Sequence, residues 1–324
     1  MIDYEIFFKR RLEPTELPAL ETHWDLVIGA IDGSDRSRKS FESIKGSKKV
    51  LVAFPEYGFP PADIPADAVA TPADADAIET AVSVLDALGD LKASKVCLDI
   101  SGFLPHHVLS FVRVLSERGV TAFDVIYTEP LRYRSSEETR FSDEIVLCVK
   151  QLAGYEGVHS PDTSHDLLVL MVGYDHALVA EVASAKEDAK KVQVFGLPSL
   201  RPDMYQEGIL RARRAAEAVG GAASDPQTFR FAPASDPFVT AAVLQKIVGQ
   251  HRAKNGGANV YLAALSTKAH ALGVGIFYLT ECRETPTSII YPVCERYERV
   301  TSEGVSGHWL YTIELPTDEA VSGG

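Results

Sequence analysis

The sequence has only four cysteines among 324 residues, and none of them form a CxxC pair. This excludes a disulfide framework and a cysteine-based zinc site, and it is typical of a reducing compartment. No apolar run approaches the roughly 20 residues that cross a bilayer. The N-terminal segment also lacks an apolar signal core and a small-residue cleavage site. We therefore expect a cytoplasmic protein with no membrane partner.

Basic residues are few: 32 Lys and Arg stand against 45 Asp and Glu, giving a formal net charge of −13. A field of this sign repels nucleic acid, so we expect no extended nucleic-acid surface. A small anion in a local basic pocket is still compatible with it. The sequence also contains no GxSxG, HExxH or kinase motif, and neither a GxGxxG nor a Walker loop. The common catalytic and dinucleotide-binding signatures are therefore excluded.

Short apolar runs alternate with amphipathic stretches along most of the chain. Two strand–loop–helix–strand units are clear, one over residues 95–130 and the other over residues 166–199. Nearly continuous apolar strands joined by amphipathic helices are typical of parallel strands buried on both faces. We therefore predict an α/β protein with one or more parallel, Rossmann-like sheets and helices on both faces.

Each half of the chain contains blocks of about the same size, which favours two Rossmann-like halves; one continuous sheet is the alternative. We place the N-terminal half at 1–158, the C-terminal half at 159–316 and a disordered tail at 317–324. Residues 308–313 are aromatic and β-branched, which predicts an antiparallel edge strand at the C-terminus. Such an edge either closes the sheet of the second half or forms part of a dimer interface.

Polar side chains follow several of the predicted strands. Ligands of open parallel sheets bind outside the carboxyl ends of the strands, where helix N-termini present N–H groups and a partial positive charge. After the first strand, Asp32 and Gly33 form a turn and Ser34 opens a helix. Arg36 and Arg38 then supply donors for a phosphate or carboxylate. The alternative is a capped helix with a solvated basic turn.

Further candidates follow the later strands. Asp99 ends a buried strand and Ser101 follows it; a buried Asp is costly unless bonded, so it either bonds neighbouring loops or contacts a ligand. Tyr127 stands where its ring either stacks on a base or packs the rim of the sheet. Asp175 opens a helix and is either a plain N-cap or, beside His176, a ligand contact with acid–base capacity.

We predict no metal site. His106 and His107 are adjacent on a helix and should point in different directions, at least one of them to solvent, which makes them poor joint ligands. We expect Mg²⁺ as a cofactor only if the protein is an enzyme. In that case the carboxylates expected at strand ends would gather around the ion; they are Asp32, Asp35, Asp99 and Asp175.

Ser266, Thr267 and Lys268 stand between the predicted strand NVYLAAL and the helix that follows it. Two hydroxyls and an ammonium at a helix N-terminus favour an anion. The alternative is a serine cap beside an exposed lysine.

The segment NVYLAALSTKAHALGVGIFYL, residues 259–279, resembles the CARF-type Rossmann-like sensor domains of CRISPR-associated and related defence proteins. Some of those carry a Thr-Lys pair at the same junction, usually after glycines; here Ala263, Ala264 and Leu265 stand in their place. The resemblance implies that Thr267 and Lys268 contact a phosphate of a nucleotide-type ligand. It also implies a homodimer that acts in antiviral defence through an effector protein partner.

Three functions stay open. The first is a sensor-like module that binds a phosphorylated small molecule, such as a nucleotide, and needs no cofactor. The second is an Mg²⁺-dependent enzyme acting on a nucleotide or phosphate ester. The third is a protein-interaction subunit of a larger assembly.

Overall fold

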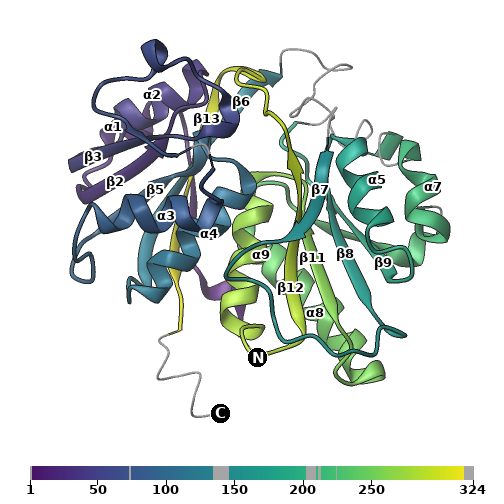
Figure 1. Ribbon diagram of the computed structural model, residues 1–324. Helices are drawn as coiled ribbons and strands as arrows, with labels where there is room; N and C mark the ends of the chain where they lie inside the picture. The colour runs from purple at the N-terminus through teal and green to yellow at the C-terminus, as the bar shows by residue number, and fades with distance from the viewer. Residues whose placement is uncertain are drawn as a thin grey trace. The chain divides into compact units, whose positions relative to one another are not determined.

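The computed structural model describes residues 2–72, 74–133, 146–201, 209–210, 213–223 and 225–316. The chain forms two compact units, each with its own sheet (Figure 1). The N-terminal unit comprises Ile6–Asp143 and Arg296–Gly324, and the C-terminal unit comprises Met1–Glu5 and Glu144–Glu295. Both sheets are mostly parallel and are flanked by helices, so the predicted Rossmann-like α/β class is confirmed.

The sheet of the N-terminal unit has the order β1-β13-β6-β5-β2-β3-β4. Its strands are β1 (Lys9–Leu12), β2 (Trp24–Ala30), β3 (Gly46–Ala53), β4 (Val69–Ala70), β5 (Val96–Asp99), β6 (Ala122–Tyr133) and β13 (Ser302–Glu314). Its α-helices are α1 (Glu16–Ala19), α2 (Asp35–Ser43), α3 (Ala77–Asp86) and α4 (Pro105–Glu117). The five strands from β6 to β4 are parallel to one another, whereas β13 is antiparallel to both β6 and β1.

The sheet of the C-terminal unit has the order β10-β9-β8-β11-β12-β7. Its strands are β7 (Val146–Gln151), β8 (Leu167–Val172), β9 (Lys190–Gly196), β10 (Phe229–Ala232), β11 (Val260–Ala264) and β12 (Thr287–Cys294). Its described α-helices are α5 (His176–Ser184), α7 (Ala216–Val219), α8 (Pro237–Asn255) and α9 (Lys268–Glu281). All neighbouring strands are parallel except β7, which is antiparallel to β12.

The two sheets share one connectivity. The orders β4-β3-β2-β5-β6-β13 and β10-β9-β8-β11-β12-β7 correspond strand by strand. Each has five parallel strands, with the strand that comes first in the sequence in the middle, and an antiparallel strand beside the last of the five. The antiparallel strands are exchanged. β7 follows β6 along the chain but pairs with β12, and β13 follows β12 but pairs with β6.

This exchange corrects two expectations. The C-terminal strand is antiparallel as predicted, but it closes the sheet of the N-terminal unit rather than that of the second half. It is also not an edge strand, because β1 pairs with its outer side. The chain passes between the units at residues 5–6, 143–144 and 295–296, so each unit is built from two separate segments of the sequence. The predicted tail at 317–324 lies outside the described residues.

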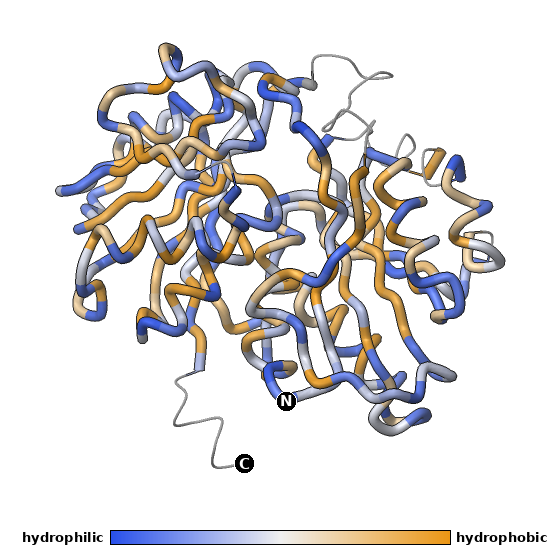
Figure 2. The backbone as a smooth tube through the Cα atoms, in the orientation of Figure 1, coloured by the Kyte–Doolittle hydropathy of each residue, from blue (hydrophilic) through white to orange (hydrophobic). Residues whose placement is uncertain are grey.

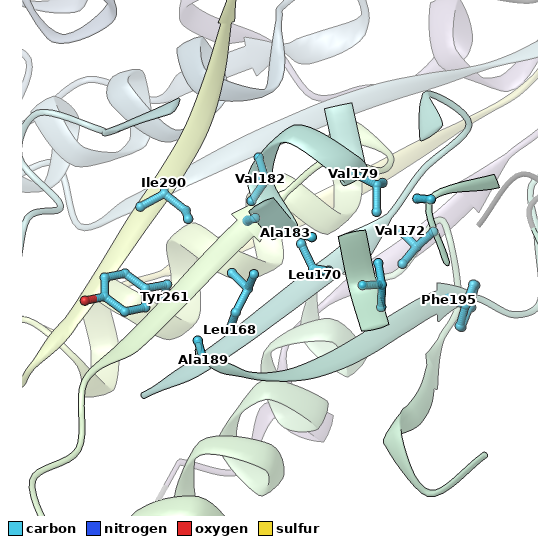
Figure 3. Close-up of a cluster of buried hydrophobic side chains, with 13 residues drawn as sticks. Leu168, Leu170, Val172, Val179, Val182, Ala183, Ala189, Phe195, Tyr261 and Ile290 are labelled. Carbon is cyan, nitrogen blue, oxygen red and sulfur yellow. The ribbon is translucent and has the colours of Figure 1, made fainter. Parts of the chain in front are cut away.

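The burial of apolar strand residues against helices explains why these segments form sheets. β8 is buried along its whole length and reads as an unbroken apolar run (Figure 2). Figure 3 shows Leu168, Leu170 and Val172 of β8 against Val179 and Val182 of α5. Alternate residues of β8 therefore pack on one helical layer, as expected for a strand covered on both faces. In the described part of the chain, no helix is both long and apolar enough to cross a membrane.

Helix α3 begins with a capping box formed by Asp76 and Glu79. Three strands, β1, β4 and β7, were not expected from the sequence.

Candidate functional site

In each sheet the strand order reverses between two neighbouring parallel strands. In the N-terminal unit the chain runs from β2 through β3 to β4 and then returns to β5 on the other side of β2. In the C-terminal unit it runs from β8 through β9 to β10 and returns to β11 on the other side of β8. Ligands of open parallel sheets bind at such switch points, outside the carboxyl ends of the strands. The loops after β2 and β5, and those after β8 and β11, are therefore the candidate sites.

The loop after β2 is closed by its own side chains. Asp32 is only 4% exposed. It accepts hydrogen bonds from the Ser34 N–H at 2.8 Å, the Ser34 hydroxyl at 2.7 Å and the Ser37 hydroxyl. Ser34 is also the N-cap of α2, since its Oγ accepts from the Ser37 N–H at 3.2 Å. The carboxylate and hydroxyl predicted to meet a ligand thus hold the loop in shape.

Arg36 is turned into the protein. It is buried, with Nη1 donating to the Thr128 carbonyl oxygen at 2.5 Å and Nη2 to the Ser101 carbonyl oxygen at 3.0 Å. Nη2 also lies 3.7 Å from Oδ2 of Asp32. This orientation does not support the prediction that Arg36 meets a phosphate. The guanidinium instead ties the start of α2 to β6 and to the turn after β5.

Asp99, Ser101 and Tyr127 are buried as well. Asp99 accepts from the Ser101 N–H at 3.0 Å, and the Ser101 Oγ accepts from the Thr128 N–H at 3.0 Å. Burial raises the pKa of Asp99, which favours its neutral form. Tyr127 lies within β6 opposite Trp309 of β13, so its ring packs in the unit rather than offering an open face to a base.

Arg38 points to solvent on α2. Its guanidinium pairs with Asp35 at 2.9 Å and with Glu42 at 3.1 Å. The hydrogen bond from Arg38, followed by the charge of Lys39, holds the pKa of Asp35 below its usual range. Because these pairs are exposed, they fit the alternative of a solvated basic turn.

Residues from later parts of the chain lie close to the turn at Gly33. Its φ of +76° lies in the left-handed region that favours glycine. A Cβ at this position would lie 3.5 Å from Val300 and 3.6 Å from both Arg299 and Phe59. The Arg299 guanidinium lies 5.0 Å from the centroid of the Phe59 ring. The polar groups of the N-terminal switch point are therefore bonded to one another, and Gly33 itself stays exposed.

The C-terminal switch point brings two of the predicted groups together. A Cβ on Gly173, directly after β8, would lie 1.9 Å from the Leu265 carbonyl oxygen and 3.1 Å from the Ser266 Cα. Glycine therefore lets the loop after β8 pass directly against the loop after β11. Tyr174 and Ser266 are next to this contact, and both are half-buried.

Thr267 is the N-cap of α9. Its Oγ1 accepts from the His270 N–H at 3.1 Å and donates to the Ala234 carbonyl oxygen at 2.5 Å. His270 is fully buried, and its Nε2 lies 3.1 Å from the Pro233 carbonyl oxygen. These bonds hold the loop after β10 against the start of α9. The hydroxyl predicted to contact a phosphate is thus used by the protein itself.

The other predicted residues of this unit differ in exposure. Asp175 is buried and caps α5, accepting from the Leu178 N–H at 3.4 Å. Ser266 and Lys268 are half-buried at the N-terminus of α9, which is 14 residues long. His176, the first residue of α5, is also half-buried. A hydroxyl, an ammonium, a phenol and an imidazole thus border two touching loops.

The sequence did not predict the cluster formed by Glu56, His106 and His107. The expectation that His106 and His107 point apart, at least one of them to solvent, is wrong. Both are buried, and their Nε2 atoms lie 3.2 and 2.8 Å from Oε1 of Glu56. Burial lowers the pKa of His107 to about 4. Burial also raises the pKa of Glu56, but the hydrogen bonds from the two histidines outweigh it and hold that pKa below its usual range.

No family model matches the sequence, and neither does any curated protein. Among solved structures, the chain is similar to a CobK precorrin-6A reductase, with 15% identity over 83% of this chain and 88% of that chain, at a TM-score of 0.24. At this TM-score the similarity carries no argument about the site. The fold assignment rests on the strand order of the two sheets.

Proposed function

We propose that the C-terminal unit binds a phosphate group of a nucleotide-type small molecule at the switch point between β8 and β11. The observation that carries the proposal is the contact between Gly173 and Leu265, which joins the two loops at the edge where strand order reverses. Ser266 and Lys268 lie half-buried on one of these loops. Parallel sheets bind ligands at this place.

The chemistry of the edge suits an anion. The N-terminus of α9 carries a partial positive charge from the aligned peptide dipoles, and Lys268 adds an ammonium to it. A hydrogen bond to a charged group contributes roughly 1.5–3 kcal/mol. Tyr174 and His176 border the same edge with ring systems that suit the apolar face of a base. Ser266 adds a hydroxyl donor.

Binding rather than turnover is the proposed role, because carboxylates needed by an Mg²⁺-dependent enzyme have other partners. Asp32 bonds Ser34 and Ser37, Asp175 caps α5, and Asp35 pairs with Arg38. A sensor module is consistent with the resemblance to CARF-type domains. The homodimer, the effector protein partner and the defence setting that this resemblance implies belong to the same proposal.

Thermal unfolding of the full chain against a nucleotide panel tests it. A ligand present at 100 times its Kd stabilises the folded state by about 2.7 kcal/mol, which raises the melting temperature measurably. Lys268→Ala should reduce the shift, whereas Lys246→Ala, an exposed lysine on α8, should leave it unchanged. Equal shifts in both variants, or none with any nucleotide in the wild type, would contradict the proposal.

A further inference from the structure

Three side chains that commonly bind metals meet at the carboxyl edge of the N-terminal sheet. Glu56 lies in the 3-10 turn η2 (Pro55–Tyr57) that directly follows β3. His106 and His107 lie in the first turn of α4, which follows β5. One oxygen and two nitrogens from these side chains lie within 4.8 Å of one another. No segment of the chain holds all three, so the fold itself assembles the group.

The group is enclosed by aromatic rings. The Phe54 ring stacks on His107, with centroids 3.7 Å apart and planes at 11°. Phe103 contacts Phe54 edge-on at 5.3 Å. The side chains of His106 and His107 are 7% and 1% exposed, whereas that of Glu56 is 23% exposed. The two imidazoles thus lie in a largely apolar setting, and the Glu56 side chain is the most exposed of the three.

Two of its polar atoms lack a protein partner. Oε2 of Glu56 and Nδ1 of His107 are buried, and neither makes a hydrogen bond within the described residues. A buried carboxylate oxygen without a donor is costly. A bound cation beside the carboxylate would compensate for this cost by direct attraction.

We propose that Glu56, His106 and His107 form a binding site for a divalent transition-metal ion, Zn²⁺ in the first instance. The Nε2 atoms lie 3.2 and 2.8 Å from the carboxylate oxygen. A tetrahedral Zn²⁺ with ligands at about 2.0–2.1 Å holds those ligands about 3.3 Å apart, so small side-chain shifts admit the ion. Three protein ligands leave a coordination position for water or an exogenous ligand.

The ligand set decides the class of ion. Imidazole nitrogens suit zinc and iron, whereas Mg²⁺ and Ca²⁺ prefer oxygen ligands throughout. Two histidines and one carboxylate with an open position are found in catalytic zinc sites and, with octahedral geometry, in non-haem Fe²⁺ sites. The site is in the N-terminal unit, so it is independent of the anion site proposed for the C-terminal unit.

The competing explanation is a purely structural clamp, in which both imidazoles donate Nε2–H to an ionised Glu56. The variant Glu56→Gln distinguishes the metal site from the structural clamp. Glutamine keeps the side-chain volume and an acceptor oxygen for both donors, but it removes the anionic ligand. Loss of an outer-shell partner typically weakens metal binding about 10- to 100-fold, so loss of this direct ligand should weaken it more than about 100-fold.

The test uses the full chain, free of any histidine tag and stripped with a chelator. Zn²⁺ is titrated calorimetrically, and Co²⁺ is added separately to read tetrahedral coordination from its visible absorption. The wild type should bind close to one ion per chain, because the three ligand atoms converge on one point. Glu56→Gln and His106→Gln should lose both signals. Glu21→Gln and His23→Ala, exposed residues of the same unit, should keep them.

If the wild type binds no ion, the proposal is overturned in favour of the clamp. The same holds if Glu56→Gln and His106→Gln bind the ion as tightly as the wild type. Circular dichroism and thermal unfolding without metal show that each variant is folded. Nucleotide-dependent stabilisation, if measured in parallel, should be unchanged in Glu56→Gln, so failure of this proposal and failure of the anion site are distinguishable.

Discussion

Gly173 and Leu265 approach each other so closely that a Cβ on the glycine would lie 1.9 Å from the leucine carbonyl oxygen. The two residues directly follow neighbouring parallel strands, β8 and β11, between which the strand order of the C-terminal sheet reverses. Their contact defines the geometry of the proposed anion site. The equivalent edge of the N-terminal sheet is filled by its own polar side chains, as the bonds of Arg36 show.

Gly173→Ala should disrupt this contact. The added methyl group cannot be placed without moving one of the two loops, and overpacking of this kind typically costs about 1–3 kcal/mol. Gly249→Ala is the matched control, because a Cβ at this exposed position of α8 meets nothing within 4 Å. Alanine within a helix should add about 0.5–1 kcal/mol of stability relative to glycine. Urea denaturation of both variants checks that the free energy of unfolding falls in Gly173→Ala and rises in Gly249→Ala.

Arg36→Ala should unfold the N-terminal unit more readily without affecting ligand binding. The change leaves the buried carbonyl oxygens of Thr128 and Ser101 without their donor, which should cost about 3 kcal/mol in total. Arg38→Ala, which removes an exposed guanidinium from the same helix, should stay close to the wild type. A stable Arg36→Ala variant that has lost nucleotide binding would restore the sequence-based interpretation of Arg36 as a ligand contact.

The stability of the C-terminal unit should fall with acidification through His270. Burial lowers the pKa of His270 to about 4, from about 6.5 for an unperturbed histidine. Between these values the unfolded chain binds a proton that the folded unit does not, so the stability is complete above pH 6.5 and is lost as the pH falls toward 4. One histidine with this shift contributes a loss of at most about 3 kcal/mol. Unfolding free energies from pH 7 to pH 4 should decline less steeply in His270→Gln; an unchanged slope would contradict the assignment.

Deletion from residue 302 onward should abolish folding of the N-terminal unit. β13 lies between β6 and β1 and pairs with both, so its loss exposes two strands and removes Tyr311 and Ile313 from the core. A deletion that begins at residue 317 leaves β13 intact and serves as the control. Limited proteolysis and thermal unfolding of the two truncated chains provide the measurement. Equal stability of both truncated proteins would refute the structural role of β13.

Local patterns were enough to predict the fold class and the strand ends that carry polar residues. β8 and β11 are continuous apolar runs, and a turn or cap residue follows each, so their boundaries are encoded within a few neighbouring positions. The same signal located Asp32 and Ser266 at strand ends. Local sequence does not encode which side chains turn inward.

The missed features all depend on residues far apart in the chain. Arg36 reaches a carbonyl 92 positions away, and Glu56 meets His106 from 50 positions away. Either side chain is equally compatible with solvent when only its neighbours are known. The pairings of β7 with β12 and of β13 with β6 are non-local in the same way, because the two strands of each pair lie far apart in the sequence.

The central claim is that the C-terminal switch point recognises phosphate. Isothermal titration of the full chain with a nucleotide and with its unphosphorylated nucleoside tests this claim most directly. The nucleotide should bind the wild type, and the nucleoside should bind at least about 10-fold more weakly, since one charge-assisted contact contributes roughly 1.5–3 kcal/mol. Lys268→Ala should narrow that difference. Equal affinities for nucleotide and nucleoside, unchanged by Lys268→Ala, would contradict the account.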